Sequence, residues 1–264
     1  MENRYIKITD EEINEILERH QRFLEGHYTK DFEELRANFV NVDLSGKDFS
    51  NMNLFGAYFH NVNLRNANFC HANLRYTSIT LSDMENVNLC QADLRVSIIR
   101  CVDLSCATIK STDFRYASLD SCNFNKVVFD GNTNFQNSHI YNPINPPNFI
   151  PMACPDTGAF IGWKKCRAHG KDNEELIVKL LIPEDARRSS ATGRKCRCDK
   201  AVVLEIQDMD GNEVEKVAYS TNTMHFKYEK GKTVEPEKPF CEDRFAECAS
   251  GIHFFINRQE AVNY

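Results

Sequence analysis

The sequence has no run of about 18 consecutive apolar residues, which is the length that a helix needs to cross a bilayer. Its N-terminal stretch, MENRYIKITDEEINEILERH, is polar and acidic and lacks the apolar core of a secretory signal peptide. We therefore expect no membrane association, and we predict a cytoplasmic location.

An excess of basic residues is also missing. Lys and Arg number 32 against 38 Asp and Glu, which gives a net charge of -6, whereas a non-specific nucleic-acid binder is normally basic. With 264 residues, 42% apolar and 27% charged, the chain is long enough for two folded domains. Eleven cysteines without an export signal are expected to be reduced thiols.

The common signatures of catalysis and cofactor binding are missing as well. There is no Walker-type phosphate loop and no GxGxxG motif. The cysteines after position 150 are spaced C-x11-C, C-x-C and C-x6-C, whereas zinc sites commonly use CxxC pairs. Cys154 with His225 or His253 forms a nucleophile pair in principle, but it lacks the local signatures of cysteine enzymes. We expect no metal, no cofactor and no catalytic residues. An enzymatic activity of residues 152–264 is the alternative.

What the sequence does contain is a repeat of five residues. Large apolar side chains recur at nineteen consecutive positions from Phe39 to Phe129, and after one inserted residue in GNTNF they resume at Phe135 and Ile140. A smaller residue lies two positions before each of them, and Asn or Asp usually lies one position before. This period fits neither a helix nor a plain strand. It predicts a chain that turns regularly and returns each large side chain to one axis.

The repeat resembles the pentapeptide-repeat family, whose motif reads A(D/N)LXX, over residues 37–140. The resemblance implies a mainly β fold, a right-handed quadrilateral β-helix in which four pentapeptides make one square coil and residues twenty apart stack. The large residues then form four inner columns: Phe39/Phe59/Ile79/Ile99/Leu119, Leu44/Leu64/Met84/Leu104/Phe124, Phe49/Phe69/Leu89/Ile109/Phe129 and Leu54/Leu74/Leu94/Phe114.

The ends of such a solenoid must be covered, because they expose unpaired backbone groups. Thr9 and Glu12 form a capping-box pattern that predicts a helix with an apolar stripe, ending near Gly26, and a second short helix at Asp31–Leu35. We interpret residues 1–36 as a helical cap over the first coil. A helix that binds a partner is the alternative.

The five-residue period ends at the Pro-rich stretch 141–151, which we interpret as a linker because proline removes ladder donors. Residues 152–264 are predicted to form an α+β domain with strands at 159–166, 176–183, 201–208, 214–220 and 251–256, a turn at Asp210-Gly211 and a terminal helix from Arg258. The strings ACPDTGAFIGWKKC, ARRSSATGRKCR and ECASGIHFFINRQEAVNY resemble the C-terminal domain of bacteriophage and gut-bacterial pentapeptide-repeat proteins. That resemblance implies a phage or bacterial source and transfers no activity.

Two groups of residues are candidate binding sites. On the solenoid, twenty-residue stacking places Arg75, Arg95 and Arg115 in one outward ladder, with Tyr76 and Tyr116 beside it. Such a strip suits a protein partner or a nucleic acid, unless neighbouring Asp residues pair with the arginines. In the second domain, a basic segment suits an anion or phosphate, unless its charges pair with nearby acids. Its cations are Arg187, Arg188, Arg194, Lys195 and Arg197.

These observations favour a non-enzymatic module that binds a bacterial or phage protein, as a monomer or a homodimer. Some pentapeptide-repeat proteins mimic DNA with a strongly negative rod and thereby bind topoisomerases. Residues 37–140 carry nine acidic and eight basic side chains, which does not favour this. The alternatives are a small anionic ligand, such as a nucleotide or phosphate, or an enzyme in the C-terminal domain, and nucleic-acid binding through the Arg/Tyr face.

Overall fold

The computed structural model describes residues 5–26, 32–147, 150–169, 174–221, 223 and 225–264. The chain divides into two compact units, Met1–Ile150 and Pro151–Tyr264. No helix in the described ranges combines the length and apolar character that spanning a membrane requires.

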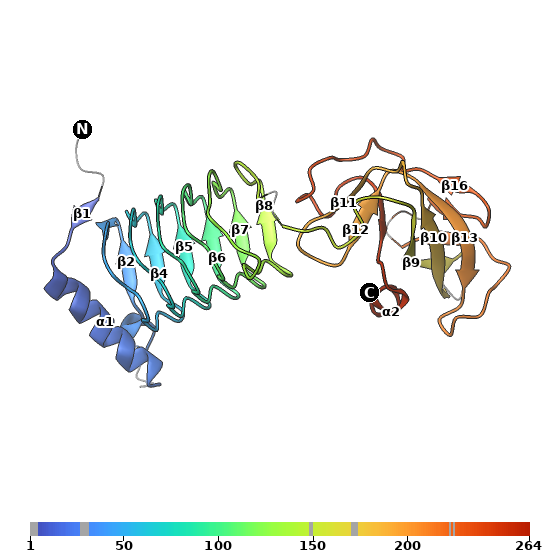
Figure 1. Cartoon of the computed structure of the whole chain (residues 1–264). Helices are drawn as coiled ribbons and strands as arrows, with labels where there is room; N and C mark the ends of the chain where they lie inside the picture. Colours follow the sequence, from blue (N-terminus) through green and yellow to red (C-terminus); the bar gives the residue numbers. More distant parts are fainter. Residues whose placement is uncertain (1–4, 27–31, 148–149, 170–173, 222, 224) are drawn as a thin grey trace. The chain divides into compact units, whose positions relative to one another are not determined.

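The first unit is built on a parallel ladder of six short strands (Figure 1). The register pairs Phe59 with Ile79 and Ile79 with Ile99, so residues twenty apart stack as predicted. One step spans 21 residues, from Leu119 to Ile140, which confirms the inserted residue. The strands are β2 (Asn38–Val40), β4 (Tyr58–His60), β5 (Ser78–Thr80), β6 (Ile98–Arg100), β7 (Ser118–Asp120) and β8 (His139–Tyr141).

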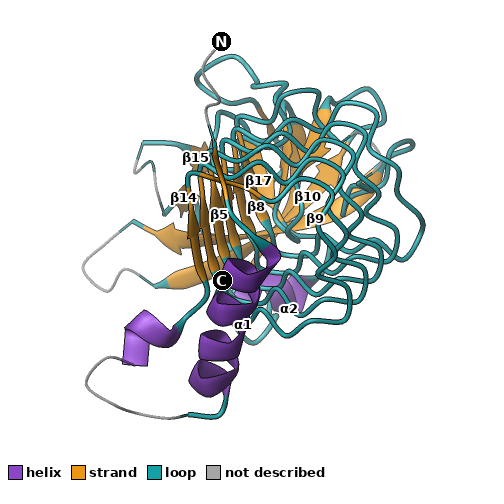
Figure 2. Ribbon diagram, turned by 90° about the vertical axis from the view of Figure 1, so that its left-hand side faces the viewer, coloured by secondary structure: helices purple, strands orange, loops and turns teal. Residues whose placement is uncertain are grey.

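The other sides of the coils are held by single bridges rather than by regular strands, and Figure 2 draws them mainly as loops. Leu54 donates its backbone N–H to the carbonyl of Asn73 (2.8 Å), and Asn73 donates to Met52 (2.9 Å). The same exchange recurs one coil later, where Leu74 donates to Asp93 (2.8 Å). Each coil thus satisfies the backbone of its neighbours, as a solenoid requires.

The inner columns form the core of this unit. Leu54, Leu74 and Leu94 are fully buried. The rings of Phe39 and Phe59 stack at a centroid distance of 5.2 Å, and other pairs twenty or twenty-one residues apart stack in the same way. The square coil predicted from the five-residue period is therefore confirmed.

The Asn or Asp that precedes each large residue has two roles at the coil corners. Its side chain accepts the N–H of the residue two positions later, as Asp93 does from Arg95 (3.1 Å). Where the residue is Asn, the side chain also donates to the neighbouring coil, as Asn73 does to Asn53 (2.7 Å). These bonds explain the preference for Asn and Asp at this position.

The C-terminal end of the solenoid departs from the sequence prediction in two places. Phe129, assigned to an inner column, is 43% exposed, because its column ends at the bridge from Thr108 to Val128. Ile144, within the stretch interpreted as a linker, still joins the coil: it donates to Cys122 (2.8 Å) and accepts from Phe124 (2.9 Å). Pro143 does not interrupt the ladder, because the backbone N–H that bonds to Cys122 belongs to Ile144 and not to Pro143.

The N-terminal segment packs on the first coil. Strand β1 (Ile6–Lys7) pairs in parallel with β3 (Val42–Asp43), and helix α1 (Asp10–Leu24) follows. The predicted capping box is present: Glu12 donates its N–H to Thr9 Oγ1 (3.2 Å), and Thr9 donates to Glu12 Oε2 (2.7 Å). The predicted second helix is found as a 3-10 turn, η1 (Phe32–Leu35), while Asp31 lies outside the described residues.

Buried His20 connects α1 to the solenoid. Its Nδ1 accepts the backbone N–H of Ala37 (3.1 Å), the first inward residue of the repeat, and its ring stacks on Phe23 at 5.4 Å. Burial lowers the pKa of His20 to about 4, so the ring is neutral at pH 7 and accepts a hydrogen bond there. The helix therefore covers the open end of the first coil.

The second unit is β-rich. A six-stranded antiparallel sheet has the order β15-β14-β9-β10-β13-β16, and a three-stranded sheet has the order β11-β12-β17. The bounds are β9 (Phe160–Ala168), β10 (Glu175–Ile182), β11 (Arg188–Ser190), β12 (Cys196–Cys198), β13 (Ala201–Gln207), β14 (Ala218–Ser220), β15 (Lys227–Tyr228), β16 (Thr233–Val234), β17 (Ile252–Phe254) and helix α2 (Arg258–Asn263).

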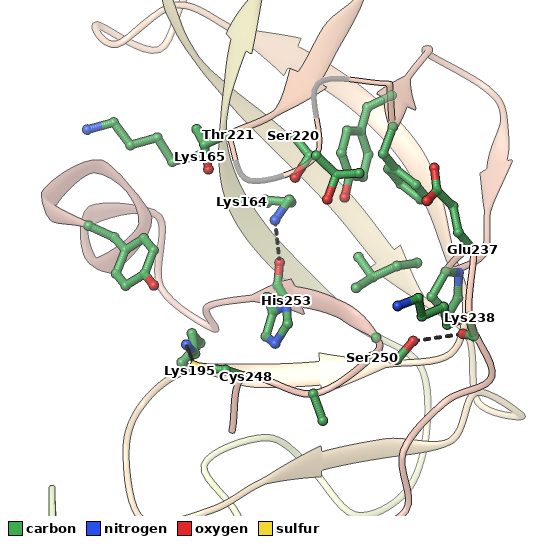
Figure 3. A pocket seen from close by; sticks show the side chains of 18 of the residues that line it. Lys164, Lys165, Lys195, Ser220, Thr221, Glu237, Lys238, Cys248, Ser250 and His253 are labelled. Carbon is green, nitrogen blue, oxygen red and sulfur yellow. Dashed lines mark hydrogen bonds between the residues drawn. The ribbon is translucent and has the colours of Figure 1, made fainter. Parts of the chain in front are cut away.

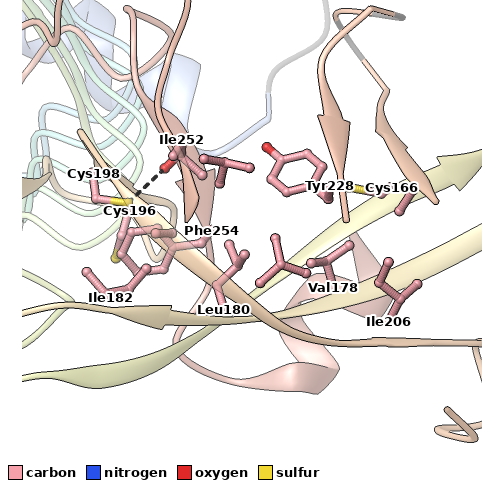
Figure 4. Packing of buried hydrophobic residues seen from close by; sticks show 14 of the residues in the cluster. Cys166, Val178, Leu180, Ile182, Cys196, Cys198, Ile206, Tyr228, Ile252 and Phe254 are labelled. Carbon is pink, nitrogen blue, oxygen red and sulfur yellow. Dashed lines mark hydrogen bonds between the residues drawn. The ribbon is translucent and has the colours of Figure 1, made fainter. Parts of the chain in front are cut away.

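Four of the predicted strands correspond to β9, β10, β13 and β17, whereas only the last three residues of the predicted strand 214–220 are extended, as β14. The turn at Asp210-Gly211 is present: Gly211 has φ 100°, and its N–H donates to Asp208 Oδ1 (2.8 Å). Between the two sheets, Figure 4 shows the buried cluster that joins them, which includes Leu180, Phe254 and the thiols of Cys166 and Cys198.

Candidate functional site

The Arg–Tyr edge is one corner of the solenoid, defined here as Arg75, Tyr76, Arg95, Val96, Arg115 and Tyr116. Arg95 donates to both oxygens of Asp93 from Nε (2.8 Å) and Nη2 (2.5 Å). Arg115 binds Asp113 in the same way. The structure therefore stacks the three predicted arginines, and it pairs two of them with carboxylates of their own coils.

Arg75 differs from the other two arginines because Asn73, not Asp, precedes it in its coil. Within the described residues no carboxylate lies at ion-pair distance from Arg75, and its buried Nε has no hydrogen-bond partner. The guanidinium carbon lies 5.8 Å from the centroid of the Tyr76 ring, which also packs against Phe55 (5.2 Å). Arg75 is therefore the arginine of this edge that forms no ion pair, although its charge still acts on Asp93 of the next coil.

The other side chains of the edge are large and exposed. Tyr76 is 51% exposed, Val96 37% and Tyr116 58%, and all three have left-handed backbone with φ of 57°, 61° and 61°. Ile98, the first residue of β6 and two positions after Val96, is 49% exposed. Val96 was absent from the predicted site, although its place in the twenty-residue column was visible in the sequence.

The basic segment predicted to bind an anion does not form one site. Arg197 is 2% exposed, and its guanidinium donates to the carbonyls of Cys241 (2.9 Å), Ser250 (3.0 Å) and Asp243 (2.7 Å). Arg188 donates to the carbonyls of Ala186, Gly158, Pro183 and Glu184. Both guanidinium groups are thus occupied with holding loops in place.

Two further cations of the segment pair with carboxylates. Arg187 binds Asp199 (2.8 Å) and Glu242 (3.0 Å), and Arg194 binds Glu260 (2.7 Å). Asp199 lies twelve residues after Arg187, whereas Glu242 and Glu260 lie far away in sequence. Lys195 is the member of the segment that faces a cavity.

That cavity, of about 520 Å³, lies in the second unit (Figure 3). Its wall combines residues of β9, β14 and β15 with residues 236–238 and 248–253 and with Lys195. Lys164, Lys195 and Lys238 line it, as do the hydroxyls of Ser220 and Ser250. This site was not predicted from the sequence; the signal that points to it is the pair Lys164-Lys165 inside an otherwise apolar strand.

Two titratable groups of the cavity have shifted pKa values. Burial lowers the pKa of Lys164, whose ammonium donates to the carbonyl of His253 (3.3 Å). Burial also lowers the pKa of His253 to about 4, and nearby Lys164, Lys195 and Arg197 lower it further; its Nε2 is bonded to the carbonyl of Glu247 (3.0 Å). His253 is therefore neutral at pH 7, and the charge of the cavity comes from its lysines.

The thiols and histidines do not assemble a metal site in the part of the chain that the structure describes, where no three Cys, His, Asp or Glu side chains gather suitably. All eleven cysteines are free. Burial raises the pKa of Cys166 to about 12, as expected for a thiol in an apolar core. Cys154 is buried in the same core cluster, whereas His253 lines the cavity.

Family models match both units. Pentapeptide repeats (8 copies) match residues 36–69 and 53–95, and a family of unknown function (DUF5758) matches residues 150–261. The chain thus contains pentapeptide repeats followed by a DUF5758 domain. No curated protein matches the chain.

Solved structures of pentapeptide-repeat proteins are similar to part of the chain. Rfr23 from the cyanobacterium Cyanothece 51142 is 23% identical over 38% of this chain and 62% of its own, with a TM-score of 0.28. The protein alr5209 from Nostoc Pcc 7120 is 19% identical over 47% of this chain and 93% of its own, with a TM-score of 0.30. QnrB1, a plasmid-mediated fluoroquinolone resistance protein, is 17% identical over 40% of this chain and 58% of its own, with a TM-score of 0.30. The chain spans less than two thirds of the lengths of Rfr23 and QnrB1.

Proposed function

We propose that this protein is a non-enzymatic interaction protein that binds a protein partner through the Arg–Tyr edge of its solenoid. The observation that carries the proposal is the exposure of Tyr76, Val96 and Tyr116 on left-handed backbone. A bulky side chain on such backbone costs about 1 kcal/mol relative to one that tolerates it. Tyr76 regains part of this by packing on Phe55 and Arg75, but about half of its surface stays exposed, as does that of Tyr116. We infer that these three side chains are kept for contact with another molecule.

The other corners of the solenoid support this reading. At the equivalent left-handed positions in the first coils stand Gly46, Asn51, Asn61 and Asn66, residue types that suit this backbone. The Arg–Tyr edge begins with Gly56 and ends with Asn137 in the same column. Other corners also carry bulky residues at such positions, such as Leu81, which is 49% exposed with φ 53°. The Arg–Tyr edge differs because its bulky apolar or aromatic residues stand in three consecutive coils.

The charges of the edge indicate the chemistry of the partner. Asp93 and Asp113 neutralise Arg95 and Arg115, and their carboxylates stay partly exposed at 27% and 24%. A nucleic-acid backbone would bring phosphates against these carboxylates, which is unfavourable. We infer a protein surface that offers apolar or aromatic side chains to Tyr76, Val96 and Tyr116 and an acidic side chain to Arg75.

We also propose a bacterial or phage setting, a reducing cytoplasm and a monomeric or homodimeric chain. Support for the setting comes from the resemblance of the C-terminal strings to phage and gut-bacterial proteins. Support for a reducing compartment comes from eleven cysteines that form no disulfide.

The experiment is affinity capture from a lysate of the source cells with three forms of the full chain. The triple variant Tyr76→Asn/Val96→Asn/Tyr116→Asn changes the edge, and His71→Asn/Gln91→Asn changes two exposed left-handed positions on another corner. We expect one protein to be retained by the wild type and the control variant and lost with the triple variant. Retention by all three forms, or retention of nucleic acid only, contradicts the proposal.

A further inference from the structure

We propose that the cavity of the second unit is a binding site for a nucleoside monophosphate, that is, a phosphorylated small molecule with a planar ring. The site is separate from the Arg–Tyr edge, and its chemistry is independent of the proposed protein partner. Its volume of about 520 Å³ is in the range of small-molecule pockets.

The first observation is positive charge without compensation. Lys164, Lys195 and Lys238 line the cavity, and among the described residues none of them forms an ion pair with a carboxylate. A fourth lysine, Lys165, is neutralised by Glu175 (3.1 Å). Glu237 is the one acidic residue among those that line the cavity. Burial lowers the pKa of Lys164, so Lys195 and the exposed Lys238 supply the positive charge that an anion in the cavity would neutralise.

The second observation is a set of hydroxyl groups that line the cavity. Ser220, Thr221 and Thr223 follow from β14, and Ser250 lies on the segment opposite them (Figure 3). Ser250 donates its own proton to the carbonyl of Lys238 (2.7 Å). The proton of Ser250 is therefore already used, whereas the hydroxyls of Ser220, Thr221 and Thr223 combined with lysines suit the oxygens of a phosphate group.

The third observation is aromatic surface beside the lysines. The ammonium of Lys164 lies 5.9 Å from the ring centroid of Tyr228, and the ammonium of Lys195 lies 5.8 Å from that of Tyr264. Phe226 packs on Tyr228 at 5.2 Å. Tyr228 is only 2% exposed, whereas Tyr264 is 66% exposed, so a ligand that places its phosphate among the lysines can place a flat ring against Tyr264.

The fourth observation is that the wall is held in shape from behind. Arg197 binds three carbonyls of the segment that follows residue 240. Gly251 passes so close to it, with φ 153°, that a Cβ would meet Arg197 Cβ at 3.2 Å and the carbonyl of Cys198 at 3.3 Å. Because these contacts already order the wall, ligand binding costs little conformational entropy there, which favours affinity.

Cys248 supplies the test, because it is exposed and lines the cavity, with Sγ 3.7 Å from the ammonium of Lys195. Cys101, exposed on the solenoid, is an internal control. The full chain is alkylated with iodoacetamide, and both sites are followed by mass spectrometry with AMP, GMP, CMP or UMP, with adenosine and with inorganic phosphate. We expect a nucleoside monophosphate at ten times its Kd to slow alkylation of Cys248 about tenfold and to leave Cys101 unchanged.

Variants make the result specific. Lys195→Met and Lys238→Met are each expected to abolish protection at the same ligand concentration, whereas Lys200→Met, whose partner is Asp185 outside the cavity, is expected to retain it. Because Lys238 is exposed, its variant folds even if Lys195→Met does not. The proposal is overturned if none of the four nucleotides protects Cys248, if protection survives both lysine variants, or if phosphate alone protects equally.

Discussion

The carboxylate of Asp113 lies 3.6 Å from Nε of Arg95, one coil earlier, while it also binds Arg115 of its own coil. The stacked arginines are therefore separated by stacked carboxylates, and like-charge repulsion along the edge is largely cancelled. What the edge offers to another molecule is its tyrosines, Val96 and the guanidinium of Arg75, which forms no ion pair.

The bulky left-handed residues predict an opposition between stability and binding. Val96→Asn relieves the strain of a β-branched residue at φ 61° and should stabilise the first unit by about 1 kcal/mol. Thermal unfolding should show a higher Tm, while partner binding weakens. The control Gln91→Asn starts from a residue that is not β-branched and should change Tm much less. A lower Tm for Val96→Asn would show that the valine is kept for packing.

The inner columns predict a strong cavity effect at one position. Leu74→Ala removes a fully buried side chain between Leu54 and Leu94 and should destabilise the first unit by about 3 kcal/mol. Lys110→Ala, on the exposed surface, should change stability by less than about 0.5 kcal/mol. Chemical denaturation measures both. Similar small effects in the two variants would contradict the stacked core.

His20 predicts a loss of stability in acid. Its pKa is about 4 in the folded protein and about 6.5 when unfolded, so between these values the unfolded chain binds more protons. The contribution of neutral His20 is complete above pH 6.5 and is lost as the pH falls toward 4. The wild type should therefore lose more Tm between pH 7 and pH 5 than His20→Gln, whose amide oxygen still accepts from Ala37. Equal losses would contradict the role of His20; His253→Gln provides the same comparison in the second unit.

Replacing Arg197 or Arg194 of the basic segment should lower the free energy of unfolding by very different amounts. Arg197→Ala leaves the carbonyls of Cys241, Asp243 and Ser250 without their buried donor and should cost about 3 kcal/mol or more. Arg194→Ala breaks only a half-exposed ion pair with Glu260 and should cost about 1 kcal/mol or less. Unfolding in denaturant separates the two outcomes. Comparable effects would show that Arg197 does not hold the wall of the cavity.

Much of the solenoid could be predicted from sequence because its contacts follow a fixed spacing. Once Phe39, Phe59 and Ile79 are recognised as members of one column, every other inward position follows. Phe129 was the exception, because a residue at the end of a column lacks a following coil and no periodicity reports that.

The second unit could be predicted only in part. Apolar strands such as Phe160–Ala168 were visible, but the partners of Arg197 lie more than forty residues later, and no local pattern reveals them. The basic segment was therefore interpreted as one anion site, although the fold places Arg187 before β11 and distributes the other members over β11, β12 and the loop between them. The cavity was missed because its lining comes from several distant segments.

Site-specific photo-crosslinking tests the central claim most directly. A photoreactive residue replaces Ile98, beside the Arg–Tyr edge, or in a second protein Gln91, on another corner of the solenoid. We predict that a single protein partner crosslinks from position 98 and that it does not crosslink from position 91. A partner that crosslinks from position 91 and not from position 98 would contradict the proposal that this edge is the binding surface.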